Sequence, residues 1–221
     1  MQSDTSGLRD FMRVFTNTAV SLDGRIGTVG DHHFNVASDE DRRRMALLRA
    51  QADAVFVGGQ TFRMGPHPIV EPPELRRAGR RRPIINAVLT RRGIAEHVGA
   101  DWANSDASLH VFGADLDAEA HRLCGASCHP AHGPADVLDW LESVGCGSVL
   151  VEGGGDLIFQ LVALDRVDSI HVTLAPRIIG GVGAPSLADG VGFSPEEIRN
   201  FVLGDVEHLG DELYLRYDRS D

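Results

Sequence analysis

A carboxylate followed by three glycines is the stretch of this sequence with the clearest chemical use. Glu152 closes a short apolar run, Val149–Val151, and the glycines 153–155 come directly after it. Glycine has no Cβ, so the backbone can turn sharply there and a ligand can come close to it. Residues 156–164 are then apolar at helical spacing. The pattern predicts a strand, a glycine turn and a helix, with Glu152 at the strand end where open α/β sheets bind ligands.

The helix start after this turn is suited to a phosphate group. Its first N–H groups have no partner within the helix, and the helix dipole adds roughly 0.3–1 kcal/mol per interaction. The dinucleotide fingerprint G-x-G-x-x-G does not fit, because Ile158 stands where its last glycine would be. A tight connection between strand and helix, without a ligand, remains the alternative interpretation.

A second strand with a glycine turn occurs earlier in the chain. The apolar run Asp53–Val57 is followed by Gly58, Gly59, Gln60 and Thr61, and the hydroxyl of Thr61 could bind a phosphate or cap a helix. Two such turns at strand carboxyl ends indicate two sides of one nucleotide cleft.

A third strand end carries cationic side chains. The buried run Ile84–Leu89 leads into Thr90, Arg91 and Arg92. Guanidinium groups give fixed bidentate hydrogen bonds, so this end suits a monoester phosphate such as the 2′-phosphate of NADP. Exposed loop charges are the alternative.

Composition limits the classes of protein that fit. The 221 residues suffice for one substantial core, and the formal charge of −11 argues against a nucleic-acid surface. The sequence has no apolar run of membrane-spanning length and no secretory signal pattern. Three cysteines suit reduced thiols. We therefore expect a cytoplasmic enzyme that binds a small molecule, with no nucleic-acid or membrane partner.

A group of histidines and cysteines raises the alternative of a zinc site. It comprises His121, Cys124, Cys128, His129 and His132. The spacing matches no standard pair of zinc ligands, and the H-x-E with P-C-x-x-C signature of zinc deaminases is missing. We therefore predict no metal.

The remaining pattern predicts a single α/β domain over residues 11–221, after a flexible tail at 1–10. Ser38 is suited to cap a helix at 39–51 that points Met45, Leu47 and Leu48 inward and carries Arg49 near its end. Further strands are predicted at 11–22, 109–112, around 127, and at 169–174, 201–207 and 212–217, and further helices at 116–123 and 135–144. The expected fold is a mostly parallel mixed sheet flanked by helices, with an antiparallel C-terminal edge.

Four ordered motifs give a family resemblance that covers nearly the whole chain. They are TAVSLDGRIGT (18–28), LLRAQADAVFVGGQT (47–61), VLVEGGGDL (149–157) and LAPRIIGGVGAPSL (174–187). In these the chain resembles the reductase domain of the riboflavin biosynthesis deaminase/reductase, whose fold is like that of dihydrofolate reductase.

The resemblance implies an activity and a set of site residues. The family uses NADPH to reduce the ribosyl chain of 5-amino-6-(5-phosphoribosylamino)uracil to a ribityl chain. Glu152 is the expected catalytic residue, and His33, Arg49 and Glu152 are expected to face the substrate. The residues expected to hold NADPH are Ala19, Asn35, Thr61, Thr90, Gly153, Gly154, Gly155, Asp156, Leu157, Ile158, Phe159 and Gln160. Relatives are usually dimers, so a homodimer is expected.

One departure from the family pattern bears on the cofactor site. The family usually continues Thr-x-x-x-Asp-x-Pro after the second glycine turn, and this chain has Gly65 at the aspartate position, with His67 nearby. Three alternatives therefore stay open: a non-deaminated diaminopyrimidinone phosphate as substrate, a pterin or folate as substrate, and an NADP-binding protein without catalysis. No deaminase domain precedes the reductase motifs, so a separate protein is expected to deaminate.

Overall fold

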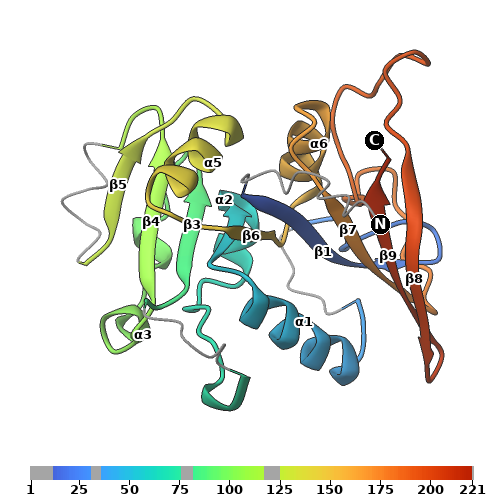
Figure 1. Cartoon of the computed structure of the whole chain (residues 1–221), viewed down its shortest axis with the longest axis horizontal. Coiled ribbons are helices and arrows are strands. Elements are labelled where there is room, and N and C mark those ends of the chain that lie inside the picture. Colours follow the sequence, from blue (N-terminus) through green and yellow to red (C-terminus); the bar gives the residue numbers. More distant parts are fainter. Residues whose placement is uncertain (1–11, 31–35, 76–81, 117–124, 221) are drawn as a thin grey trace, which may run out of the picture.

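The computed structural model describes residues 12–30, 36–75, 82–116 and 125–220. These residues form one nine-stranded sheet in the order β5-β4-β3-β2-β6-β1-β7-β9-β8 (Figure 1). The strands are β1 (Arg13–Ser21), β2 (Ala54–Gly58), β3 (Ile85–Leu89), β4 (Ser108–Gly113), β5 (Ser127–Pro130), β6 (Ser148–Val151), β7 (Ser169–Ala175), β8 (Phe201–Leu209) and β9 (Glu212–Arg219). All nine strands correspond to predicted ones.

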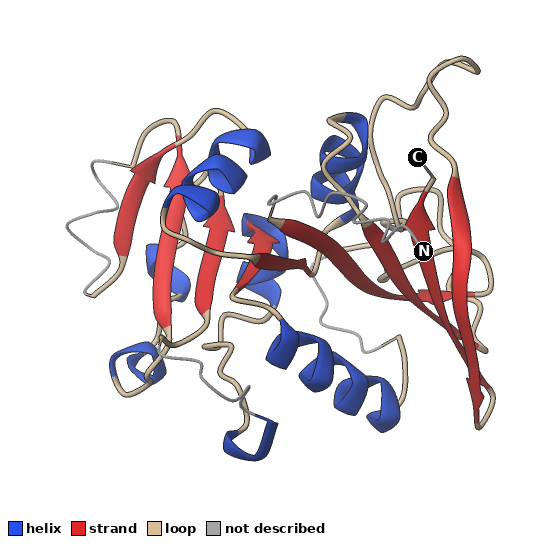
Figure 2. Ribbon diagram, in the orientation of Figure 1, coloured by secondary structure: helices blue, strands red, loops and turns tan. Residues whose placement is uncertain are grey.

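Helices cover both faces of the sheet (Figure 2). They are α1 (Asp39–Gln51), α2 (Gly59–Met64), α3 (Ala100–Ala103), α5 (Pro134–Ser143) and α6 (Gly155–Ala163), with 3₁₀ turns at Pro73–Leu75 and Ala95–His97. Side chains of α1, α2 and α3 pack in one apolar cluster, and those of α5 and α6 pack in another. The first seven strands pair in parallel, and β8 and β9 add the antiparallel edge. The predicted fold class is confirmed.

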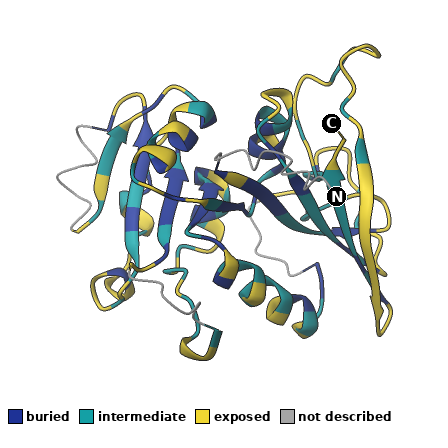
Figure 3. Ribbon diagram, in the orientation of Figure 1, coloured by how far each residue is buried: buried dark blue, intermediate teal, exposed yellow. Residues whose placement is uncertain are grey.

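The two clusters alternate along each central strand. Val55 and Leu150 lie in the cluster under α1 to α3, whereas Phe56 and Val151 lie in the cluster under α5 and α6. Successive strand residues point to opposite faces, so these strands are buried on both sides (Figure 3). This explains why their sequences are continuous apolar runs rather than alternating ones.

Helix α1 begins at the predicted cap. The Ser38 side chain accepts hydrogen bonds from the backbone N–H groups of Glu40 and Asp41, which satisfies the free donors of the first turn. One detail of the prediction is wrong: Leu47 is 49% exposed, while Leu48 packs on the core. Neighbouring positions of a helix lie about 100° apart, and α1 is oriented so that Leu48, not Leu47, faces this core.

The C-terminal part of the chain is more open. Strand β8 is exposed along almost its whole length, in contrast to the buried centre of the sheet (Figure 3). The loop 176–200 returns from β7 over the start of α6, where a Cβ on Gly155 would lie 2.4 Å from the carbonyl oxygen of Ser186. Further along this helix Phe159 stacks on Phe193, with 4.8 Å between ring centroids. The predicted tail 1–10 and most of the predicted helix 116–123 lie outside the described residues.

Candidate functional site

The sheet has a step in its carboxyl edge at its shortest central strand. Strand β6 ends at Val151, which is level with Thr16, and β1 continues to Ser21. On the other side β2 continues past the end of β6 to Gly58. The chain leaves β1 and β6 in opposite directions along the sheet, over opposite faces. Such a switch point is where open α/β sheets bind ligands.

The two glycine turns meet at this step. The N–H of Gly58 donates to the carbonyl oxygen of Gly153 at 2.9 Å. A Cβ on Gly154 would lie 3.4 Å from the hydroxyl of Thr61, and one on Gly153 would meet no atom within 4 Å. Gly153 also has a φ of +94°, which favours glycine. The backbone at Gly153 and Gly154 therefore faces open space beside Thr61.

At the start of α6 the groups that could bind a ligand belong mainly to the backbone rather than to side chains. Its cap, Gly154, has no side chain to satisfy the first N–H groups of the helix. Leu157 and Ile158 are buried in the core, so their side chains cannot reach a ligand. Asp156 accepts a hydrogen bond from Gln160 at 3.0 Å across one helical turn. Of the residues predicted here, Gly153 and Gly155 are buried, and Gly155 is covered by Ser186 and Asp189 of the loop 176–200. Gly154, which is half-buried, and the polar pair remain accessible.

Thr90 lies next to the second glycine turn. A Cβ on Gly59 would lie 2.6 Å from its Oγ1 atom, and the Thr90 side chain is buried. The backbone N–H of Arg92 donates to Thr90 Oγ1 at 3.3 Å. The side chains of Arg91 and Arg92 are exposed. The ends of β6, β2 and β3 thus form one continuous edge.

Ala19 lies on the part of β1 that extends beyond β6. It packs against a small buried cluster of Val36, Ala37 and Ala175, together with Ile179. His33 and Asn35, which were expected near it, lie outside the described residues.

Arg49 and Glu152 are joined to each other. The Nε and Nη2 atoms of Arg49 donate to Oε1 and Oε2 of Glu152, both at 2.7 Å. The two side chains are 23% and 9% exposed. Burial alone would lower the pKa of Arg49, but the Glu152 carboxylate outweighs it and raises that pKa above its ordinary value. Arg49 therefore stays charged, and within the described part of the chain its Nη1 group makes no hydrogen bond, so it is available to another partner.

A polar network next to Ala19 was not predicted. Glu212, at the start of β9, accepts hydrogen bonds from the Ser38 N–H at 2.9 Å, the Ser38 hydroxyl at 2.6 Å and the Tyr214 hydroxyl at 2.6 Å. Thr173 donates to the buried Asp41 at 2.6 Å. Burial raises the pKa of Asp41, and the nearby charge of Glu212 adds to this. Ser38 was recognisable as a cap, but its partner is 174 residues away.

A second acid, Asp23, fixes the loop that follows β7. Its carboxylate accepts hydrogen bonds from the Ser21 hydroxyl at 2.6 Å and from the N–H groups of Ile179 and Gly180 at 3.1 and 2.7 Å. These bonds, with the one from Ser21 the strongest, lower the pKa of Asp23 to about 2. The predicted Asp23-Gly24 turn thus ties the end of β1 to the loop beyond β7.

Gly65, which stands where the family usually has an aspartate, has open space around it. A Cβ there would meet no atom within 4 Å. The side chain of His67 is 82% exposed, and its Nδ1 atom lies 3.2 Å from Asp101 Oδ2.

His129, one of the histidines considered for zinc, lies in a group of rings instead. His129 stacks on His110, with Nδ1 of His110 3.0 Å from Nε2 of His129, and Trp140 lies against both rings. Burial and then the nearby His129 lower the pKa of His110 to about 4. Over the described ranges no group of three or more His, Cys, Asp or Glu side chains could hold a metal. His121 and Cys124 lie outside those ranges.

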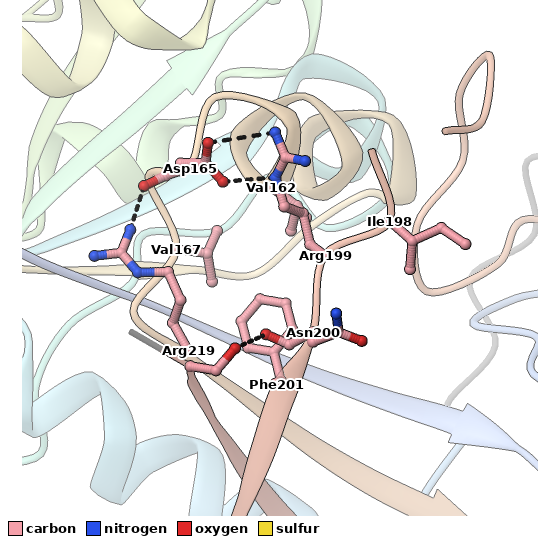
Figure 4. A pocket seen from close by; sticks show the side chains of 9 residues that line it. Val162, Asp165, Val167, Ile198, Arg199, Asn200, Phe201 and Arg219 are labelled. Carbon is pink, nitrogen blue, oxygen red and sulfur yellow. Dashed lines mark hydrogen bonds and ion pairs between the residues drawn. The ribbon is translucent and has the colours of Figure 1, made fainter. Parts of the chain in front are cut away.

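A small cavity of about 130 Å³ lies at the far end of α6 from the glycine turn (Figure 4). An ion pair and a hydrogen bond lie at its rim: Arg199 Nε is 2.7 Å from Asp165 Oδ1, and Arg219 donates to the Asp165 carbonyl oxygen. Its polar groups are paired with one another, so this cavity is not a candidate for the nucleotide.

Comparison with known proteins gives the family. The family model described as the RibD C-terminal domain matches residues 12–215. The chain is 26% identical over 209 residues to the 2,5-diamino-6-ribosylamino-4(3H)-pyrimidinone 5′-phosphate reductase of Archaeoglobus fulgidus, covering 90% of this chain and 94% of that protein. It is 32% identical over 183 residues to the riboflavin biosynthesis protein RibD of Synechocystis, covering 79% of this chain and 48% of that protein.

Solved structures agree on the fold. RibD of Acinetobacter baumannii superposes with a TM-score of 0.78 at 19% identity, covering 96% of this chain and 59% of that one. Dihydrofolate reductase of Enterococcus faecalis superposes with a TM-score of 0.58 at 13% identity, covering 96% of this chain and 99% of that one. The chain thus spans about half the length of the RibD proteins. None of the helices within the described ranges is long and apolar enough to cross a membrane. The chain belongs to the RibD C-terminal domain family and has the dihydrofolate reductase-like fold of that family.

Proposed function

We propose that this protein is an NADPH-dependent reductase of riboflavin biosynthesis that reduces the ribosyl chain of 5-amino-6-(5-phosphoribosylamino)uracil to the ribityl chain. The observation that carries the proposal is the meeting of two glycine turns, at Gly58 and Gly153, beside Thr61 at the switch point of the sheet. Family membership and the names of the matched relatives, which are reductases of this pathway, support it.

The residues at the edge fit a dinucleotide. Open space over Gly153 and next to Gly154 allows a pyrophosphate to approach the backbone, and the uncapped start of α6 supplies N–H donors. Thr61 and Thr90 would hold further phosphate or ribose oxygens, and the nicotinamide ring would lie near Ala19. When bound, NADPH supplies the hydride.

Arg49 and Glu152 would act on the substrate as a unit. The free Nη1 group of Arg49 would hold the substrate phosphate, while Glu152 fixes the plane of the guanidinium and orients the substrate. The opened ribosylamine carries an imine, and reduction adds a hydride at C1′ and a proton at the nitrogen. The chain's part is to position the substrate and to relay that proton from water through Glu152.

A second candidate substrate is favoured by the comparisons. The relatives that the chain matches over almost their full length, from Archaeoglobus fulgidus and Methanothermobacter thermautotrophicus, are named as reductases of the non-deaminated diaminopyrimidinone phosphate. The match to this chain covers 94% and 96% of these two relatives, which leaves no room in either of them for an additional deaminase domain.

One assay decides between these activities. The purified protein is given NADPH with each pyrimidine phosphate in turn, and with dihydrofolate as the pterin, and NADPH oxidation is followed. We expect turnover with the deaminated pyrimidine, whereas turnover with the diamino compound alone selects the second candidate. Tight NADPH binding without turnover of any substrate would favour the alternative of a non-catalytic NADP-binding protein. An E152Q variant with unchanged turnover and KM would remove Glu152 from the site.

We also propose a homodimer in the cytoplasm. Support for the dimer comes from edge strand β8, whose side chains Val202, Leu203, Val206 and Leu209 are 45–59% exposed. An unpaired apolar edge of this kind favours association. Light scattering on the wild type and on V206K tests it: we expect a dimer that the lysine disrupts, and a monomeric wild type contradicts it. Cell fractionation tests the location.

A further inference from the structure

A second polar cavity lies on the other side of α1 from Arg49. It has a volume of about 280 Å³ and opens between α1 and strands β7, β8 and β9. Arg44, Leu47 and Gln51, which line it, are three or four positions apart and so share one side of the helix. Arg49 follows Leu47 by two positions and faces Glu152 instead. The cavity is therefore separate from the edge proposed to bind the nucleotide.

Three guanidinium groups converge on this cavity in a chain of net charge −11. They belong to Arg13 at the start of β1, Arg44 on α1 and Arg216 on β9. Arg44 stacks on the Tyr214 ring, 4.3 Å from its centroid, and Arg13 on the Phe15 ring at 4.7 Å. Stacking fixes the planes of both groups while leaving their edges free to donate hydrogen bonds.

Acidic side chains lie next to two of the three guanidinium groups. Arg44 pairs with Glu207, and Arg216 Nε lies 3.3 Å from Asp218 Oδ2. Asp205 is the acidic residue among those that line the cavity. Arg13 has no acidic partner among the residues that the structure describes, where it donates to Ser169 at 3.3 Å. The lining itself thus carries three positive charges against one negative charge.

His171 is a partly buried histidine in the lining of the cavity. It lies on β7, in register between Asn17 of β1 and Arg216 of β9. Burial, followed by Arg13 and Arg216, lowers the pKa of His171 to about 4, while Asp218 acts in the opposite direction and Arg44 adds to the lowering. Its Nε2 atom is buried without a hydrogen-bond partner in the described part of the chain, as is Arg216 Nε by hydrogen-bond geometry. Buried polar atoms of this kind are normally satisfied by a ligand or water.

We propose that this cavity binds a small phosphate monoester, at a site distinct from the proposed nucleotide edge. The forked donors of Arg13, Arg44 and Arg216 match the oxygens of a phosphate. Leu47 and Leu48 provide an apolar wall for the organic part of the molecule. The volume is close to the lower limit of about 300 Å³ for small-molecule pockets, which restricts the ligand to roughly the size of a sugar phosphate or an aryl phosphate.

Calorimetric titration with phenyl phosphate and with inorganic phosphate tests the proposal. Both are titrated into the full chain with saturating NADP⁺ present. We expect phenyl phosphate to bind more tightly than inorganic phosphate, because only the former contacts the leucines. R13Q is expected to weaken binding about tenfold, which corresponds to one charge-assisted contact. L47E, which places a carboxylate at the exposed rim, is expected to weaken it similarly.

R166Q is the matched control, because Arg166 pairs with Asp139 away from the cavity. It is expected to bind both probes as the wild type does. The proposal is overturned if R13Q and L47E bind as tightly as R166Q, or if the wild type binds neither probe. Loss of NADPH turnover in the reductase assay would not alter this outcome, since the variants are compared with one another. Melting curves confirm that each variant is folded.

Discussion

The edge at Gly153 and the cavity at Arg13 are both suited to phosphate, but they are built from different groups. At the edge the donors are backbone N–H groups, and the nearby guanidinium of Arg49 is already joined to Glu152. In the cavity the donors are three guanidinium side chains. The edge therefore depends on the conformation of the chain, whereas the cavity depends on charge. Substitutions should separate the two.

The largest effect is expected from breaking the ion pair at the edge. E152A leaves Arg49 charged and largely buried, which should lower the free energy of unfolding by about 3–5 kcal/mol. E207A removes the partner of Arg44 in the exposed pair near the cavity and should cost under about 1 kcal/mol. Urea denaturation measures both. Equal losses would contradict the difference between the two regions.

A methyl group on the glycine turn should have the next largest effect. In G155A the new Cβ would lie 2.4 Å from the Ser186 carbonyl oxygen, so the loop 176–200 must move. We expect a loss of about 1–3 kcal/mol in stability, as for other overpacked sites. Thermal unfolding checks this, with G133A as the control because its Cβ meets no atom within 4 Å. A melting temperature equal to that of G133A would show that the loop does not hold the turn.

Lowering the pH should reduce the stability of the protein through His171 in the cavity. The pKa of His171 is lowered to about 4 in the folded protein, against an ordinary 6.5, mainly because of burial. Unfolded chains bind the proton below pH 6.5 and folded ones only near pH 4, so stability falls across this window as pH decreases. H171N should make the fall between pH 6.5 and 4 shallower, and the part that remains includes His110, whose pKa is also lowered to about 4. H97N, at an exposed position, serves as the control. Melting temperatures against pH measure it.

The smallest effect is expected at Gly65. G65D restores the aspartate of the family pattern, and its Cβ would meet no atom within 4 Å. We expect the free energy of unfolding to change by less than about 0.5 kcal/mol. Unfolding curves test this, and a large loss would show that the space over Gly65 is needed by the fold. The KM for NADPH, measured in parallel, reports whether a carboxylate helps the edge.

The fold was largely predictable because its information is local. Buried parallel strands appear as apolar runs such as Val149–Val151, and glycine turns and the Ser38 cap mark where helices begin. The structure confirms the order of these elements. It differs at Leu47, where an apolar residue is exposed because it belongs to the wall of the cavity rather than to the core.

The partners within the site were less predictable. Arg49 and Glu152 were both selected, but each was assigned to the substrate, and only the folded chain shows that they bind each other. Such contacts join residues more than a hundred positions apart, which no local pattern records. A glutamate at the end of a buried strand does indicate that a cation is needed nearby, but the sequence does not show which arginine supplies it.

The shortness of β6 has a mechanical consequence. Strands β1 and β2 are not paired with each other; each is joined to β6 over only three or four residues (Figure 1). The few backbone hydrogen bonds of β6 therefore join the half of the sheet formed by β5, β4, β3 and β2 to the half that contains β1, β7, β9 and β8. A molecule bound across the end of β6 would contact both halves of the sheet and so stabilise the junction between them. Each tenfold rise in its concentration above Kd should then add about 1.4 kcal/mol to the stability of the whole sheet.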